Sequence, residues 1–288
     1  FSQDVTVFGG SLGQVYGELA EAAGDAAAGG YRGENFAGIQ TLVTNGIILV
    51  ESGGATGWPA TDFMEDMVLR EAGPDVYDQW VNHEIPFDDP QIVASLERAG
   101  SILQNEDYVN GGIGDSRSIA TTPWADAGLQ VLDGNCFLFR AASFFEAQLP
   151  EGTDVGPDGD IFAFYLPADT AEEKPLLIAG DYLAPFSDTP AAQAVEAYLA
   201  SPEWANTRME IGGMVSPNAG ADPEKASSDV LRLTIDLFQD EGATARFDGS
   251  DLMPSQVGAG SFWSELTNWI DGQQTAAEAL AKVESSWP

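Results

Sequence analysis

The stretch Ile47-Ile-Leu-Val-Glu-Ser-Gly-Gly-Ala-Thr-Gly-Trp-Pro-Ala-Thr-Asp62 passes from an apolar run, through a glycine-rich loop, into a helical pattern. Its first four residues are aliphatic and lie between a glycine and a glutamate, which is typical of a short buried strand. From Thr61 to Arg70, three apolar residues recur at helical spacing, and Gly73-Pro74 then ends the pattern. A strand followed so closely by a helix predicts an α/β fold.

The same alternation of strand and helix signals continues along the chain. In the helix expected to open at Thr189-Pro190, Val195 and Leu199 should face inward. Other helix starts are predicted where a capping side chain precedes a proline or begins a capping box, at Asp89-Pro90, Ser201-Pro202 and Thr275-Ala-Ala-Glu278. Apolar runs predict strands at 5–8, 47–50, 137–139, 161–166 and 176–178.

Acidic residues dominate the composition. The 288 residues include 46 acids and 11 bases, which gives a formal net charge of −35. Such a surface repels phosphate backbones and anionic head groups, so we expect no nucleic-acid partner and no membrane-surface partner. No apolar run is long enough to predict a membrane span. The start at Phe1 shows no signal-peptide pattern and is interpreted as mature or trimmed, which is compatible with a lipid anchor upstream.

Residue types needed for most catalytic chemistries are scarce. Cys136 is the one cysteine and His83 the one histidine, which excludes an internal disulfide and a zinc site built from these residue types. No phosphate-binding loop, dinucleotide-binding glycine pattern or nucleophile elbow is present. Glycoside hydrolysis by two carboxylates stays an alternative, because acidic residues are abundant. We predict a binding protein without cofactor or metal rather than an enzyme.

Aromatic residues beside polar groups point to a carbohydrate site, because rings stack on pyranose faces and polar side chains hydrogen-bond the hydroxyls. Trp58 is expected on a loop, where it either stacks on a ligand or caps a core. Arg140 follows an apolar run and needs a partner, which either a salt bridge or a sugar hydroxyl would supply. Trp263 is expected in the first turns of a helix. The candidates from this pattern are Glu51, Trp58, Asp62, Trp124, Arg140 and Trp263.

Motifs spread from Glu51 to the last residue also carry a family resemblance. They are Glu51–Asp62, Tyr77–His83, Ala179–Pro185, Ser201–Trp204, Gly212-Gly213, Ser216–Asn218 and the final stretch Arg246–Pro288. Together they resemble the alpha-glucoside substrate-binding proteins of ABC transporters, which are similar in fold to maltose-binding proteins. The resemblance implies a two-lobed periplasmic binding protein fold with a hinge. Lobe 1, in shortened form, would comprise residues 1–46 and 178–222, and lobe 2 would comprise 47–177 and 223–288.

The resemblance also implies a function and places candidate residues in the cleft. Trp58, Arg140 and Trp263 would line it from one lobe, whereas Asp181 and Tyr182 would lie on the return through the hinge. Such a protein binds an alpha-glucoside or related small sugar outside the cytoplasm, in the periplasm or at the cell surface. It would deliver that sugar, as a monomer, to the permease of an ABC importer without catalysis.

The chain departs from the family pattern between about Asn45 and Leu49. There it passes directly from a stretch resembling the family's opening strand, second strand and helix to one that lies well into the other lobe. Much of the first lobe is therefore expected to be absent, and a non-binding interaction or scaffold fragment stays a second alternative. Family members often carry another cysteine just before the motif at Glu51. Here no cysteine stands there, so Cys136 is expected to be unpaired.

Overall fold

The computed structural model describes residues 2–3, 6–9, 49–51, 57–106, 108–109, 114–133, 138–156, 159–166, 168 and 173–288. Strands and helices alternate among them, which confirms the predicted α/β class. Residues 45–48 of the predicted junction and Cys136 lie outside the described residues. The expectations of a missing lobe segment and of an unpaired thiol therefore stay predictions.

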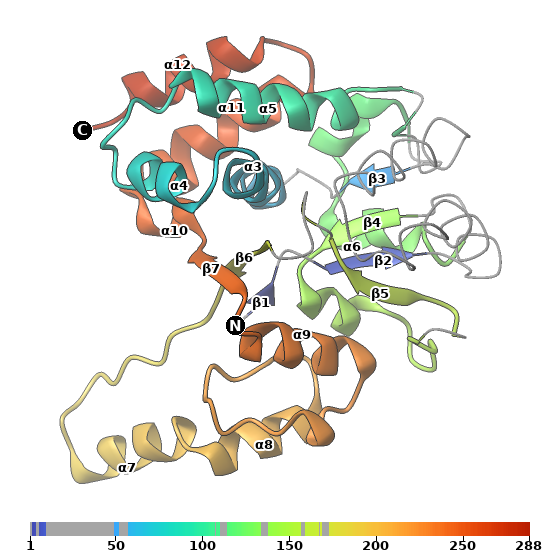
Figure 1. The fold of residues 1–288 in the computed structure, drawn as a ribbon, viewed down its shortest axis with the longest axis vertical. Helices are drawn as coiled ribbons and strands as arrows, with labels where there is room; N and C mark the ends of the chain where they lie inside the picture. The colour runs from blue at the N-terminus through green and yellow to red at the C-terminus, as the bar shows by residue number, and fades with distance from the viewer. Residues whose placement is uncertain are drawn as a thin grey trace.

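A three-stranded sheet lies at the centre of the molecule (Figure 1). Its order is β1-β6-β7, with β1 at Ser2–Gln3, β6 at Lys174–Ala179 and β7 at Ala243–Phe247. β1 runs antiparallel to β6. β7 runs parallel to β6, and Ile178 of β6 lies opposite Phe247 of β7. Because parallel neighbours end at the same sheet edge, the residues after Ala179 come to lie beside those after Phe247.

A four-stranded sheet forms the second framework. Its order is β3-β4-β2-β5, with β3 at Leu49–Glu51, β4 at Leu138–Ala141, β2 at Thr6–Gly9 and β5 at Phe162–Tyr165. β3 runs parallel to β4, whereas β2 is antiparallel to both β4 and β5. The five strands predicted from apolar runs are thus confirmed to within a few residues at their ends. β1 and β7 carry too few consecutive apolar residues to have been predicted.

Helices lie above and below these sheets in the view of Figure 1. They are α3 (Trp58–Glu71), α4 (Pro74–Val81), α5 (Pro90–Leu103), α6 (Trp124–Leu129), α7 (Pro190–Leu199), α8 (Pro202–Ile211), α9 (Asp229–Gln239), α10 (Gly249–Leu252), α11 (Trp263–Ile270) and α12 (Ala276–Ser285). Short 3-10 turns lie at η1 (Ser116–Ala120), η2 (Ser143–Gln148) and η3 (Pro223–Lys225), and a π-helical turn, η4, at Val257–Phe262. None of these described helices has the length and apolar character that a membrane crossing requires.

The predicted helix starts are confirmed by their caps. The side chains of Asp89, Thr189 and Ser201 each accept a backbone N–H bond at the starts of α5, α7 and α8. Each is followed by a proline, which lacks the N–H that a first helical turn leaves unpaired anyway. Local sequence therefore fixes where these helices begin, independently of what they pack against.

The main core packs α3, α4, α5, α11 and α12 around buried aromatic rings. The ring of Phe87 lies 4.8 Å from that of Trp80 and 5.0 Å from that of Phe262, between ring centroids. All three side chains are fully buried. A smaller cluster around Phe139 and Phe145 covers the four-stranded sheet. This main core holds α3 and α11 in place, and the first residues of these two helices line the cavity described below.

The expectation that Val195 and Leu199 face inward is wrong for Val195, and Leu199 is only half-buried. No residue of this helix is buried by the part of the chain that the structure describes, and the side chain of Val195 is exposed. The extended segment before it also exposes Leu183 and Phe186. The apolar face was read correctly as a helical face, but periodicity cannot show whether a packing partner is present.

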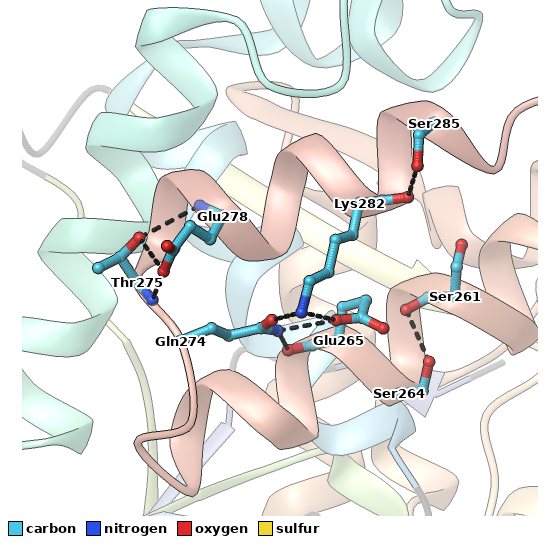
Figure 2. Close-up of polar contacts among 8 residues, drawn as sticks. All are labelled: Ser261, Ser264, Glu265, Gln274, Thr275, Glu278, Lys282 and Ser285. Atoms are coloured by element: carbon cyan, nitrogen blue, oxygen red, sulfur yellow. Dashed lines mark hydrogen bonds and ion pairs between the residues drawn. The ribbon is translucent and has the colours of Figure 1, made fainter.

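A polar network ties α12 to α11 (Figure 2). The Gln274 side chain donates to the backbone oxygen and the carboxylate of Glu265, at 2.8 and 2.9 Å. Lys282 lies 3.3 Å from the same carboxylate and also donates to Gln274. At the start of α12, Thr275 and Glu278 form the predicted capping box. The second turn of α12 is thus held by side chains as well as by its apolar face.

Thr275→Ala is expected to lower the free energy of unfolding by about 1 kcal/mol, because the capping oxygen for the Glu278 N–H is lost. Urea denaturation followed by circular dichroism would measure it. Ser264→Ala is the matched control, since Ser264 donates only to Ser261 one helical turn back at an exposed position. Equal destabilisation of the two variants would contradict a specific contribution from the capping box.

Candidate functional site

A cavity of about 440 Å³ opens where the starts of α3 and α11 meet the ends of β6 and β7. We call it the indole pocket, after the two tryptophans in its wall. It is lined by Trp58, Asp62, Phe144, Ala179, Gly180, Asp181, Gly213, Met214, Asp248, Ser250, Asp251 and Trp263. Its wall therefore combines aromatic rings with carboxylates drawn from distant parts of the chain.

The two indoles come from the first residues of two helices. Trp58 begins α3 and Trp263 begins α11, so the placement of Trp58 on a loop is corrected. Pro59 explains the difference, because proline is favoured in a first helical turn and extends α3 back beyond Thr61. Trp263 is confirmed at the start of its helix. Two helix starts some two hundred residues apart thus supply the aromatic part of the site.

Gly57 allows these helix starts to approach each other. It caps α3 with a φ of 87°, and a methyl group in place of its hydrogen would lie 2.5 Å from the Cβ of Trp263. Any side chain at position 57 would therefore clash with Trp263 and would also meet backbone strain. Within the glycine-rich loop before Trp58, glycine is therefore needed at position 57 to avoid a clash with Trp263.

Gly57→Ala is expected to cost about 2 kcal/mol of folding stability and to weaken any ligand held between the indoles, because it adds strain and pushes against Trp263. Gly73→Ala is the matched control. Gly73 also has a φ of 87°, but a methyl group there would meet nothing within 4 Å. Thermal denaturation of both variants separates strain from clash, and an equal loss of stability would contradict the predicted contact.

Further rings support Trp58 from behind. The ring of Trp124 lies 5.4 Å from that of Trp58, and the ring of Phe144 lies 5.0 Å from that of Trp124. Phe144 lines the indole pocket, whereas Trp124 is not in the lining set. Trp124 thus contacts the site through Trp58 and Phe144. Phe144 was missed because an aromatic residue next to Phe145, which is fully buried, gives no sign of facing a pocket.

Carboxylates form the polar part of the pocket. Asp62 follows Trp58 by one helical turn, and Asp181 follows the end of β6. Asp248 accepts the hydroxyl of Ser250 at 2.8 Å and the backbone N–H of Asp251 at 3.2 Å. Burial, and then the nearby Asp248, raise the pKa of Asp251. The segment from Arg246 to Trp263 was singled out for its tryptophan, but its acidic residues were missed because acids are common throughout the chain.

Arg140 lies outside the lining set of the indole pocket. Its guanidinium pairs with Asp66 at 3.2 Å and lies over the ring of Phe63, with 5 % of the side chain exposed. Another contact reaches the backbone oxygen of Asp62 at 3.4 Å. Of the two alternatives left open by the sequence, the structure provides the salt bridge. A link to the pocket remains through Asp62.

The two other candidates are placed differently. The side chain of Tyr182 is 75 % exposed, and its ring lies 5.8 Å from that of Phe247, outside the lining set. Glu51 ends β3 in register with Arg140 of β4. The structure describes the backbone of Glu51 but not its side chain, so a ligand contact from Glu51 stays a prediction.

A second cavity, of about 530 Å³, lies between α5, η1 and α11. One of its walls contains Trp269, whose backbone oxygen accepts a bond from Gln104 at 2.7 Å. None of the residues proposed from the sequence lines it. The indole pocket, which gathers four of the eight candidates, is therefore the candidate binding site.

Comparison with known proteins finds no matching family model. It does find sequence relatives. The chain is 38 % identical over 242 residues to the osmoprotective compounds-binding protein GgtB of Synechocystis, and 36 % identical over 241 residues to the alpha-glucosides-binding periplasmic protein AglE of Rhizobium meliloti. These matches cover 83 % and 82 % of this chain, but 56 % and 51 % of the relatives. The predicted resemblance is confirmed, and the chain spans little more than half the length of these relatives.

Solved structures show the same fold. A chitin oligosaccharide binding protein matches with a TM-score of 0.69 at 15 % identity, over 99 % of this chain and 68 % of the other. RafE from Streptococcus pneumoniae matches with a TM-score of 0.68 at 13 % identity, over 98 % of this chain and 70 % of the other. Maltose-bound MalE3 of T. maritima matches at 0.56 and 15 % identity, over 98 % and 70 %. The predicted binding-protein fold is therefore confirmed.

Proposed function

Since this chain is a sequence relative of osmoprotectant- and alpha-glucoside-binding proteins and has the fold of solute-binding proteins, we propose that it binds an alpha-glucoside or related small sugar without catalysis. The observation that carries this proposal is the meeting of Trp58 and Trp263 in one cavity with carboxylates. Indole rings stack on the apolar faces of a pyranose, and carboxylates accept its hydroxyls. The volume of about 440 Å³ fits the size of a small-ligand pocket.

Each candidate residue has a proposed part in binding. Trp58 and Trp263 stack on the sugar, with Trp124 supporting Trp58. Asp62 on α3 and Asp181 after the end of β6 accept hydroxyl groups of the sugar. The remaining candidates, Glu51, Arg140 and Tyr182, act at the margin, Arg140 through its contact with the Asp62 backbone.

The proposed place of this binding is outside the cytoplasm, in the periplasm or at the cell surface, with delivery to the permease of an ABC importer. The names of the relatives support it, since one of them is called a periplasmic alpha-glucosides-binding protein. The strand connection at Ala179–Asp181 lines the pocket and leads to α7 and α8. In the proposed scheme the protein acts as a monomer, and this connection belongs to the hinge between two lobes that close on the sugar.

Titration of intrinsic tryptophan fluorescence with maltose, trehalose, sucrose and glucosylglycerol tests the proposal. Stacking of a sugar on Trp58 and Trp263 should change the emission saturably for at least one of them. The same sample should release no nitrophenol from p-nitrophenyl alpha-glucoside. A folded sample that responds to none of the four sugars, confirmed by calorimetry, would count against sugar binding by this chain. Release of nitrophenol would favour the hydrolase alternative.

A further inference from the structure

A fully buried carboxyl group lies directly beneath the polar wall of the indole pocket. Glu65 is on α3, one turn after Asp62, and none of its surface is exposed. Its carboxyl oxygens accept the backbone N–H groups of Gly249 and Ser250, the latter at 3.0 Å. The hydroxyl of Tyr77, from α4, lies 2.9 Å from Glu65 Oε2. One side chain thus joins α3 and α4 to the start of α10.

The backbone groups held by Glu65 belong to the segment that lines the pocket. Asp248, Ser250 and Asp251 are all in the pocket wall, and Gly249 lies between them. Gly249 can approach only because it has no side chain: a Cβ there would lie 2.5 Å from Val81 and 3.3 Å from Glu65. The position of this part of the wall is therefore set from beneath, by contacts that do not touch the cavity.

The geometry around Tyr77 limits how the protons can be arranged. Its hydroxyl lies 2.9 Å from Glu65 Oε2 and also 2.9 Å from the backbone oxygen of Phe247. A hydroxyl has one proton, so it can donate to only one of these oxygens at a time. If Glu65 carries a proton, it can donate to Tyr77, and Tyr77 can then donate to Phe247. With Glu65 in its neutral form, hydrogen bonds can therefore form at both of these distances at the same time.

The charges around Glu65 favour the same form. Burial, and then the charge of Asp248, raise the pKa of Glu65 well above its ordinary value of 4.5. Burial and Glu65 likewise raise the pKa of Tyr77. Charged groups on the other elements around α3 are engaged in pairs of their own. These pairs are Asp66 with Arg70 and Arg140, Glu71 with Arg98 of α5, Asp78 of α4 with Arg246 of β7, Lys174 of β6 with Asp240, and Glu265 of α11 with Lys282. Asp62 and Asp251 complete the ionisable set on α3 and α10.

We propose that Glu65 is a positioning residue of the indole pocket, and that the proton between Glu65 and Tyr77 determines how firmly Asp248, Ser250 and Asp251 are held. Loss of that proton places a negative charge on Glu65 beside Asp248, and Tyr77 then donates its hydrogen bond to Glu65 instead of to the backbone oxygen of Phe247. Repulsion between the two carboxylates then loosens the wall at Asp248. The predicted change in affinity rests on the proposed sugar binding. The predicted changes in the free protein do not depend on it.

Glu65→Gln tests the proposal, because it keeps the shape of the neutral side chain and removes its titration. As the pH rises from the ordinary carboxyl value of 4.5 through the raised pKa of Glu65, the wild-type protein should lose about tenfold in affinity for whichever of the four sugars above it binds most tightly. The Glu65→Gln variant should lack this loss and keep only the pH dependence contributed by Asp251, whose pKa is also raised. Tyr77→Phe should move this loss to a higher pH, since the Tyr77 hydrogen bond lowers the pKa of Glu65.

Glu146→Gln is the matched control. Glu146 is partly buried, accepts the hydroxyl of Ser228 at 2.8 Å and also has a pKa raised chiefly by burial, but it does not line the pocket. Its pH profile of affinity should equal that of the wild type. A Glu65→Gln variant that is folded and keeps the wild-type pH profile would overturn the proposal, as would a Glu146→Gln variant that flattens it.

A measurement without ligand separates this proposal from the proposed function. The amide resonances of Gly249 and Ser250, followed by nuclear magnetic resonance in the free protein, should shift with the titration of Glu65 and stay constant in Glu65→Gln. If they do so and no sugar binds, the proposed function fails while the positioning role stands. If they do not move in the wild type, the positioning role is wrong even where sugar binds.

The stability of the free protein gives a further check with a definite sign. A raised pKa means that the folded state keeps its proton to a higher pH than the unfolded chain. Stability from this proton is therefore complete below about pH 4.5 and is lost as the pH rises through the raised value. Glu65→Gln should gain in stability relative to the wild type as the pH rises. A gain at falling pH would contradict the neutral form.

Discussion

Replacing Asp66 with alanine is expected to lower the free energy of unfolding by about 3–5 kcal/mol, the largest stability effect predicted for this protein. Asp66 has no exposed side-chain surface and pairs with Arg70 at 3.0 Å and with Arg140 at 3.2 Å. Both arginine side chains are 5 % exposed. Removing Asp66 would take a shared carboxylate away from two buried guanidinium groups, and removing one partner of a buried ion pair is costly.

Urea denaturation followed by circular dichroism would measure this effect. The matched control is Asp115→Ala, which also removes an aspartate from an arginine, but at an exposed pair with Arg117. Exposed pairs contribute little, because water screens both charges and the side chains lose entropy. Asp115→Ala should therefore lower the free energy of unfolding only slightly, mainly through loss of the cap that its side chain gives to the Arg117 N–H at the start of η1. A small loss for Asp66→Ala, close to that of the control, would show that water reaches the buried cluster.

Replacing Trp263 with alanine is expected to weaken sugar binding by about thirtyfold, or about 2 kcal/mol. Trp263 supplies one of the two indoles of the pocket, and truncating a buried aromatic group in a binding pocket typically removes this much affinity. Because the same change also removes the contact with Gly57, Trp263→Phe is needed as well. Phenylalanine keeps a ring for stacking and should lose less affinity than alanine.

Isothermal titration calorimetry with the sugar that binds the wild-type protein would measure both variants. Trp204→Ala is the control, since Trp204 lies on α8, 6.0 Å from the ring of Tyr198, and does not line the pocket. Its affinity should equal that of the wild type. If Trp263→Ala binds as tightly as the control variant, the indole pocket is not where the sugar lies.

Arg140 shows where sequence reasoning reached its limit. An arginine after an apolar run needed a partner, and that much followed from the cost of burying a charge. Which partner it takes depends on Asp66, seventy-four residues earlier in the sequence. Asp66 lies in a helix with several other acids, and only the packing of α3 on β4 selects it.

At Asp248–Asp251 in the pocket wall, in contrast to Arg140, nothing in the sequence indicated that these residues line the site. The segment was singled out because an irregular stretch leads to Trp263, but acidic residues occur throughout a chain with 46 of them, so composition gave these no weight. What distinguishes them is Glu65 beneath their backbone. That contact joins two segments more than 180 residues apart. No pattern within either segment contains this information.

The sequence by itself determined the α/β class, the starts of the capped helices and the presence of Trp58 and Trp263 at the ends of glycine-rich approaches, because each depends on residues a few positions apart. Only the tertiary structure decided that both indoles share one cavity, that Arg140 pairs with Asp66, and that α7 buries none of its residues. The physical reason is that periodicity and capping act over one or two turns of chain. Burial and charge pairing depend on which distant segments pack together.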